Sequence, residues 1–106
     1  MELVEAVYRC TRGFPHEEVF GLTAQIRRAA ISVPSNLAEG AGRNSSRELL
    51  HYVGISCGSV AELQTQLELA VRLNYLNADA ECILLVGRVG KLITALRKSI
   101  RASLAV

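Results

Sequence analysis

The chain has 106 residues, of which half are hydrophobic and two are proline, and its formal net charge is +2. This length and composition fit one packed domain over residues 1–106 and argue against disorder, while so small a charge does not by itself indicate nucleic acid. No apolar run approaches the ~18 to 20 residues that span a bilayer, and the first residues lack the layout of a signal peptide, so we expect a soluble cytoplasmic protein.

The first predicted helix covers residues 3–12, where apolar side chains recur at helical spacing. Gly13-Phe14-Pro15 ends it, because proline lacks the amide hydrogen that a continuing helix needs. Glu17 and Glu18 follow the proline, and acids suit the positive end of a helix dipole. We therefore expect a new helical turn directly after Pro15.

The second predicted helix covers residues 22–39 and has two distinct sides. Its core side consists of Leu22, Ile26, Ala29, Ala30, Val33 and Leu37. The neighbouring polar stripe consists of Gln25, Arg28, Ser32, Asn36 and Glu39. Pro34 lies inside this pattern without a capping residue before it, which predicts one kinked helix rather than two separate ones.

A glycine turn, Gly40-Ala41-Gly42, is predicted to end the second helix. Ser45 and Glu48 then form a predicted capping box, in which the Ser45 hydroxyl accepts a hydrogen bond from a free backbone amide further along the chain and the Glu48 carboxylate accepts one from a free amide before it. The third helix is predicted over residues 46–73. Its core side consists of Leu49, Val53, Val60, Leu63, Leu67, Ala70 and Val71.

Two glycines, Gly54 and Gly58, weaken this third helix by roughly 1 kcal/mol each relative to alanine. Close approach by another helix, of the same chain or of a neighbouring subunit, would compensate for that weakening. The pair therefore predicts a tight contact on this part of the helix.

The fourth helix is predicted over residues 78–103, after a turn in which Asn74 takes a left-handed conformation and Asn77 acts as the N-cap. Its apolar face consists of Leu85, Val86, Val89, Leu92, Ile93, Leu96 and Ile100. Lys91, Lys98 and Arg101 are expected on the opposite, outer side. Long amphipathic helices with short loops predict an all-α, antiparallel up-down-up-down four-helix bundle.

Signals for catalysis or metal binding are weak in this sequence. Cys10, Cys57 and Cys82 lie far apart without a Cys-x-x-Cys pair, and are expected to be reduced residues in or near the core. Neither His16 nor His51 has a nucleophile or a paired carboxylate at a telling spacing. We therefore expect no enzyme activity, no cofactor, no metal and no small-molecule substrate.

Several strings of the sequence resemble a known family, and the most specific is residues 32–43, which contains Pro34, Gly40 and Gly42. Residues 11–15, 20–30, 58–59 and 62–67 continue the match. Residues 8–76 thus resemble the small bacterial four-helix bundle proteins related to those encoded in intervening sequences of 23S ribosomal RNA genes. The resemblance implies the bundle fold and a ring-like homopentamer, and it hints at binding to nucleic acid.

Three polar features each allow a functional and a structural interpretation. The polar stripe, together with Glu62 and Gln66 on the third helix, could be a binding groove, but an internal hydrogen-bond network is the favoured interpretation. Arg43, beside Arg47, could grip a phosphate or could cap the open carbonyls of the second helix. After Glu81 the chain has no acidic residue, so the basic residues that follow could bind phosphates or form a solvated face: Arg88, Lys91, Arg97, Lys98 and Arg101.

Two hypotheses follow from the sequence. The first is a homo-oligomer, expected to be a pentamer, that binds the backbone of RNA or DNA through its basic faces: Arg43, Arg47, Lys91, Arg97, Lys98 and Arg101. The second is a protein-interaction scaffold that docks a helical or enzyme partner. Neither hypothesis involves a membrane.

Overall fold

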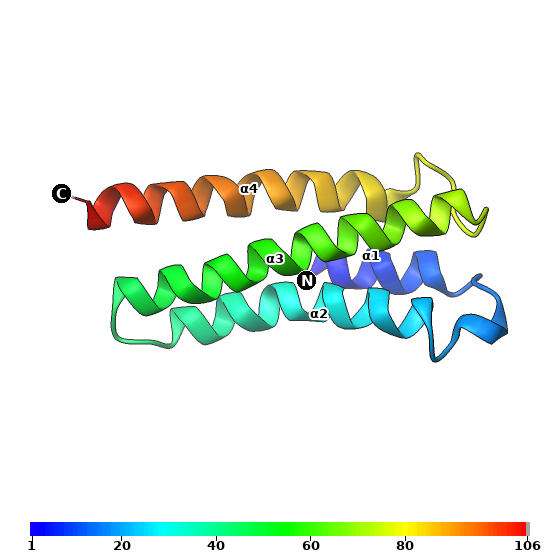
Figure 1. The fold of residues 1–106 in the computed structure, drawn as a ribbon, viewed down its shortest axis with the longest axis horizontal. Helices are drawn as coiled ribbons and strands as arrows, with labels where there is room; N and C mark the ends of the chain where they lie inside the picture. The colour runs from blue at the N-terminus through cyan, green and yellow to red at the C-terminus, as the bar shows by residue number, and fades with distance from the viewer. Residues whose placement is uncertain (106) are drawn as a thin grey trace.

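The computed structural model describes residues 1–105. It contains four α-helices and one 3-10 turn: α1 (Glu2–Thr11), η1 (His16–Glu18), α2 (Leu22–Ala41), α3 (Ser46–Arg72) and α4 (Glu81–Leu104). The α-helices pack against their neighbours in sequence, α1 also packs against α4, and the molecule measures 49 × 23 × 18 Å (Figure 1). The predicted antiparallel four-helix bundle is confirmed.

The core follows the predicted apolar sides of α2 and α3. Its fully buried large side chains include Ile26 of α2 and Val53, Leu63 and Leu67 of α3. The shorter residues Ala29, Ala30 and Ala70 let the two helices lie close together along their length. The seam between α2 and α3 is therefore the most extensive helix pair in the molecule.

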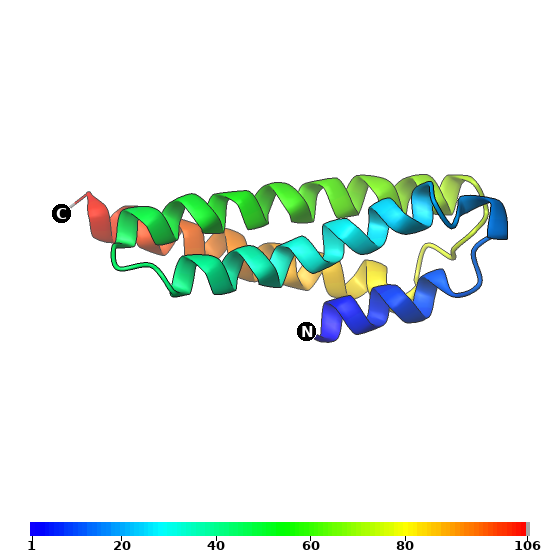
Figure 2. The ribbon, with the colours of Figure 1, turned by 90° about the horizontal axis from the view of Figure 1, so that it is seen from below.

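The first helix is much shorter than the helices that it covers. α1 has 10 residues and α4 has 24, which correspond to roughly 15 Å and 36 Å at 1.5 Å per residue. In Figure 2, α1 spans only one half of the space between α2 and α4 and its N-terminus lies near the middle of the bundle. Among residues 1–105, no helix fills the other half of this fourth position of the bundle.

This shortness overturns one expectation about α4. Leu92 and Leu96 were predicted on its buried face, but they are 71% and 44% exposed, because α1 does not reach them. Leu92 lines a mainly apolar depression at the start of α1, together with Met1, Leu3, Val4, Val33, Pro34, Leu37, Leu85 and Val89 and with the charged residues Glu2 and Arg88. We call this surface the apolar depression.

The turns on both sides of α3 form as the sequence predicts, with one change. The Ser45 hydroxyl accepts a hydrogen bond from the Glu48 amide at 3.2 Å, but the Glu48 carboxylate accepts one from that hydroxyl and not from a backbone amide. Asn74 has the predicted left-handed conformation, with φ of 63°. The Tyr75 and Asn74 amides bond to the Ala70 and Val71 carbonyls at 2.9 and 3.0 Å, which closes the end of α3.

The prediction that Asn77 caps the fourth helix is wrong. α4 begins at Glu81, its N-cap is Ala80, and no side chain caps it. The Asn77 carbonyl instead accepts the Ala80 amide at 3.1 Å, so residues 77–80 form a separate turn before the helix.

The end of the second helix also differs from the prediction. α2 is continuous through Pro34 and extends to Ala41, so Gly40 lies within the helix rather than in the turn after it. Gly40 is buried against α3, and a Cβ at this position would lie 2.9 Å from the Tyr52 Cβ. Glycine is needed here for close packing, and the turn itself begins at Gly42.

Candidate nucleic-acid interface

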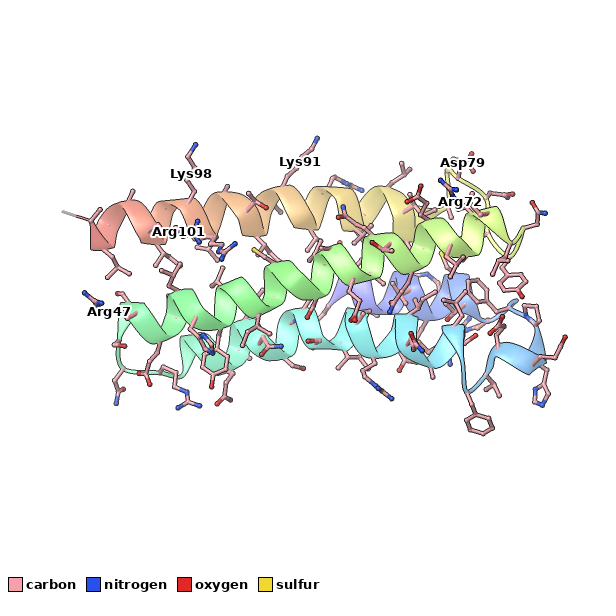
Figure 3. The ribbon with its side chains drawn as sticks, viewed as in Figure 1. Arg47, Arg72, Asp79, Lys91, Lys98 and Arg101 are labelled. Atoms are coloured by element: carbon pink, nitrogen blue, oxygen red, sulfur yellow. The ribbon has the colours of Figure 1, made fainter. Side chains whose placement is uncertain are left out.

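The basic residues of α4 divide into two groups that point in different directions. In Figure 3, Lys91 and Lys98 project outward from α4, whereas Arg101 turns toward α3 and the side on which Arg47 lies. Lys91 and Lys98 are seven residues apart and so lie in line, while Arg97 and Arg101 are four residues apart on the side that faces α3. The expectation that Arg101 shares a face with the two lysines is therefore wrong.

The second group takes part in a shallow depression between the first half of α3 and the end of α4. Its lining consists of Arg47, Leu50, His51, Gly54, Ile55, Arg97 and Arg101. We call this surface the basic depression. Its lining contains three arginines and no carboxylate, and within residues 1–105 none of these arginines forms an ion pair. It is a concave, uncompensated positive surface of the kind that attracts phosphates.

Arg97 reaches across α3 at Gly54. A Cβ added at Gly54 would lie 3.5 Å from Nη2 of Arg97, an ordinary contact distance, so the guanidinium group packs against α3 at this residue. The Nε of Arg97 is buried and has no hydrogen-bond acceptor among the described residues. Buried donors are nearly always paired, and this solvent-inaccessible nitrogen is one of three unpaired buried side-chain atoms within residues 1–105.

The two glycines of α3 therefore have different surroundings. The predicted tight contact is found at neither of them: a Cβ at Gly54 would lie at an ordinary contact distance from the Arg97 side chain, and nothing lies within 4 Å of a Cβ at Gly58. The close approach between α3 and α4 occurs instead at Gly90, whose Cβ would lie 3.2 Å from Cγ1 of Val60. Packing within residues 1–105 gives Gly58 no reason to be glycine.

Arg43 is held by neighbouring side chains. Its guanidinium group donates hydrogen bonds to the Glu39 carboxylate and, at 2.9 Å, to the Tyr52 hydroxyl. The bond to Glu39 raises the pKa of Arg43. The expected capping of α2 carbonyls by Arg43 is thus replaced by an ion pair with Glu39, and Arg43 is less available to a phosphate than Arg47.

The predicted polar network exists between α2 and α3, but it is smaller than expected. The hydroxyl groups of Ser32 and Ser59 lie 2.7 Å apart, and the Asn36 amide donates to the Ser32 hydroxyl at 2.9 Å. The buried Ser56 hydroxyl donates to the Val33 carbonyl at 2.9 Å. Sequence reasoning missed both serines of α3, although Ser56 and Ser59 stand at helical spacing on one side of that helix.

The other proposed members of the network do not join it. Gln25, Arg28 and Glu62 are exposed and form no hydrogen bond among the described residues. Gln66 is half-buried, and its Oε1 has no partner in this part of the chain. The network therefore consists of hydroxyl groups and the Asn36 amide.

The thiols lie in or near the core, as expected. Cys82 is buried, Cys10 and Cys57 are half-buried, and all three are free. Burial, followed by a hydrogen bond with Cys10, raises the pKa of the Cys82 thiol to about 12. A thiol that keeps its proton is a poor nucleophile and a poor metal ligand.

Neither a metal cluster nor a membrane-spanning helix is found in the part of the chain that the structure describes. Residues 1–105 contain no group of three His, Cys, Asp or Glu side chains arranged to hold a metal ion. None of the helices over these residues has the length and hydropathy needed to cross a membrane.

Comparison with known proteins gives one result. The model of a protein family described as 23S rRNA-intervening sequence protein matches residues 1–95. No curated protein matches the chain. The matched residues include Arg47 and His51 of the basic depression, whereas Arg97 and Arg101 lie after the match ends.

Proposed function

The chain belongs to the 23S rRNA-intervening sequence protein family, and from that premise we propose that it is a homo-oligomer that binds the backbone of RNA or DNA and catalyses no reaction. The observation that carries this proposal is the basic depression, where Arg47, Arg97 and Arg101 converge without a carboxylate. Guanidinium groups form bidentate hydrogen bonds with phosphate oxygens, and contacts with phosphates supply most of the affinity of sequence-independent binding to nucleic acid.

A second set of contacts is available on the outer side of α4. Lys91 and Lys98 project away from the bundle, on a side of α4 different from that of Arg101 (Figure 3). A strand that fills the basic depression and continues around α4 would meet these lysines next. The resulting path follows the backbone and requires no base to be read.

Oligomer formation is supported by the apolar depression. Leu92 is 71% exposed and Met1 is 84% exposed beside half-buried Leu37 and Val89, so the surface is largely apolar and unpartnered among residues 1–105. Association of several copies would cover it and would repeat the basic depression around the assembly. We propose the pentamer that the family resemblance implies, in the cytoplasm, where free thiols such as those of this chain stay reduced.

Salt-dependent binding tests the proposal. We expect the logarithm of the affinity for a nucleic-acid oligomer to fall linearly with the logarithm of the salt concentration. Arg47→Ala and Arg101→Ala should each remove one contact with a phosphate, and each should therefore reduce the magnitude of the slope by roughly 1. Arg72→Ala is the matched control, because Arg72 pairs with Glu68 at the other end of α3. Absence of binding at low salt would refute the proposal.

Light scattering on a sizing column tests the oligomer. We expect a mass several times 11.5 kDa, and dissociation after Leu92→Glu places a charge in the apolar depression. A monomer at all concentrations would refute the assembly.

The apolar depression also favours the second hypothesis, a scaffold that docks a helix of another protein. A monomer that binds no nucleic acid but captures one protein through Leu92 would support the scaffold instead.

A further inference from the structure

The basic depression is not uniformly charged. Leu50, Gly54 and Ile55 contribute apolar surface between its arginines, and the Ile55 side chain remains 39% exposed. Phosphates of a regular duplex need only the cationic groups, and such a duplex would leave this apolar surface in contact with water. The mixture of cations and apolar floor is instead typical of sites that accept a nucleotide with its base exposed.

One aromatic ring lies at the edge of this floor and is supported from the turn that follows α2. The exposed His51 imidazole packs edge-on against the Tyr52 ring, with 5.2 Å between the ring centres. Tyr52 in turn accepts the hydrogen bond from Arg43, whose guanidinium carbon lies 5.1 Å from the centre of the Tyr52 ring. Arg43 thus acts as a positioning residue for Tyr52, and through it for the ring of His51.

The α4 side of the depression supplies Arg97 and Arg101, opposite Arg47 and His51 of α3. The Arg97 guanidinium group packs against α3 at Gly54, where Nη2 would lie 3.5 Å from an added Cβ. Within a stacked duplex the faces and the Watson–Crick edge of each base are already engaged, so only an unpaired base can lay its face against a side chain of this depression.

We propose that the basic depression binds single-stranded nucleic acid in preference to duplex, with one unstacked base lying on the His51 ring and the flanking phosphates bound by Arg47 and Arg101. The inference rests on the proposed function and adds the strandedness of its ligand. Stacking on an aromatic face is available to every base, so the preference concerns strandedness and not sequence.

Fluorescence anisotropy at one low salt concentration tests this inference with three labelled probes of equal length: oligo-dT, oligo-U and a mixed-sequence DNA duplex. We expect the single strands to bind at least about ten-fold more tightly than the duplex, as base stacking on one aromatic ring implies. His51→Ala should remove most of that difference, because it should weaken the binding of the single strands more than that of the duplex. His51→Phe, which keeps a flat ring, should retain it.

His16→Ala is the matched control, because it removes the other exposed histidine of the chain, in η1. Similar affinity for oligo-dT and oligo-U supports a contact with base and phosphate that DNA and RNA share. If one of the two strands binds more tightly and this binding is weakened in His51→Ala, the inference is also supported. Equal affinity for single strands and duplex, or an unchanged preference in His51→Ala, would overturn the inference and leave the proposed function standing. No binding of any probe would instead refute the proposed function.

Discussion

The helical glycines provide the sharpest test of the packing, because an added methyl group would meet very different surroundings at different positions. Nothing lies within 4 Å of a Cβ at Gly58, whereas a Cβ at Gly40 would lie 2.9 Å from the Tyr52 Cβ and 3.2 Å from Cδ1 of Leu49. Gly58→Ala should therefore keep the full gain in helix propensity. Gly40→Ala should force apart the ends of α2 and α3.

The expected effects have opposite signs. Gly58→Ala should raise the free energy of unfolding by about 1 kcal/mol, which corresponds to roughly 4 to 8 °C in the melting temperature of a domain near this size. Gly40→Ala should lower it by roughly 1 to 3 kcal/mol, because the Tyr52 Cβ is fixed to the backbone and cannot move away alone.

Urea unfolding followed by circular dichroism measures both effects as shifts of the midpoint at constant slope. A lower midpoint for Gly58→Ala at every protein concentration would refute the packing described for α3. A lower midpoint that appears only at concentrations where the protein associates would show that a second copy packs on Gly58. Gly87→Ala is a control in α4, since its added Cβ also meets nothing within 4 Å.

Two further predictions concern a helix cap and a thiol. Ser45→Ala should lower the free energy of unfolding by about 1 kcal/mol, because the Ser45 hydroxyl accepts a hydrogen bond from the Glu48 amide, and Ser45→Gly should lower it by only about a few tenths of a kcal/mol. Urea unfolding measures both decreases, and equal decreases would contradict the capping role. Folded Cys82 keeps its proton up to a pKa of about 12, while an unfolded thiol loses it near 8.5, so the contribution of Cys82 to stability is complete below about pH 8.5 and is lost as pH rises toward 12. Stability measured from pH 8 to 11 should therefore fall more steeply in the unchanged protein than in Cys82→Ala, and parallel curves would contradict this linkage.

Features that depend on a few neighbouring residues could be predicted from the sequence. The Ser45 cap and the left-handed Asn74 follow from side-chain chemistry within one turn, and both are present. The buried sides of α2 and α3 follow from periodicity, because each of these helices has partners along most of its length. Asn77 shows the limit: an asparagine can cap a helix or enter a turn, and both roles fit its local sequence, whereas the structure places it in the turn before α4.

Features that depend on the ends of other helices could not be predicted. Helical periodicity places Leu92 and Leu96 with the core residues Val86 and Ile93, but only a helix of sufficient length on the neighbouring side would cover them. The prediction that the whole polar stripe of α2 joins one hydrogen-bond network was wrong because it also depends on a neighbouring helix. The spacing of the stripe is correct, yet only Ser32 has a hydroxyl partner on α3, Ser59, and only Asn36 bonds to Ser32, whereas Gln25 and Arg28 are exposed.

The basic depression lies between these two cases. In an antiparallel pair, the start of α3 must lie beside the end of α4, so the proximity of Arg47 to Arg101 follows from topology alone. What topology leaves open is rotation about the helix axis, which decides whether Arg97 faces α3 or solvent. In the structure the Arg97 guanidinium group packs against α3 at Gly54, so the rotation of α4 brings Arg97 and Arg101 to the same depression as His51.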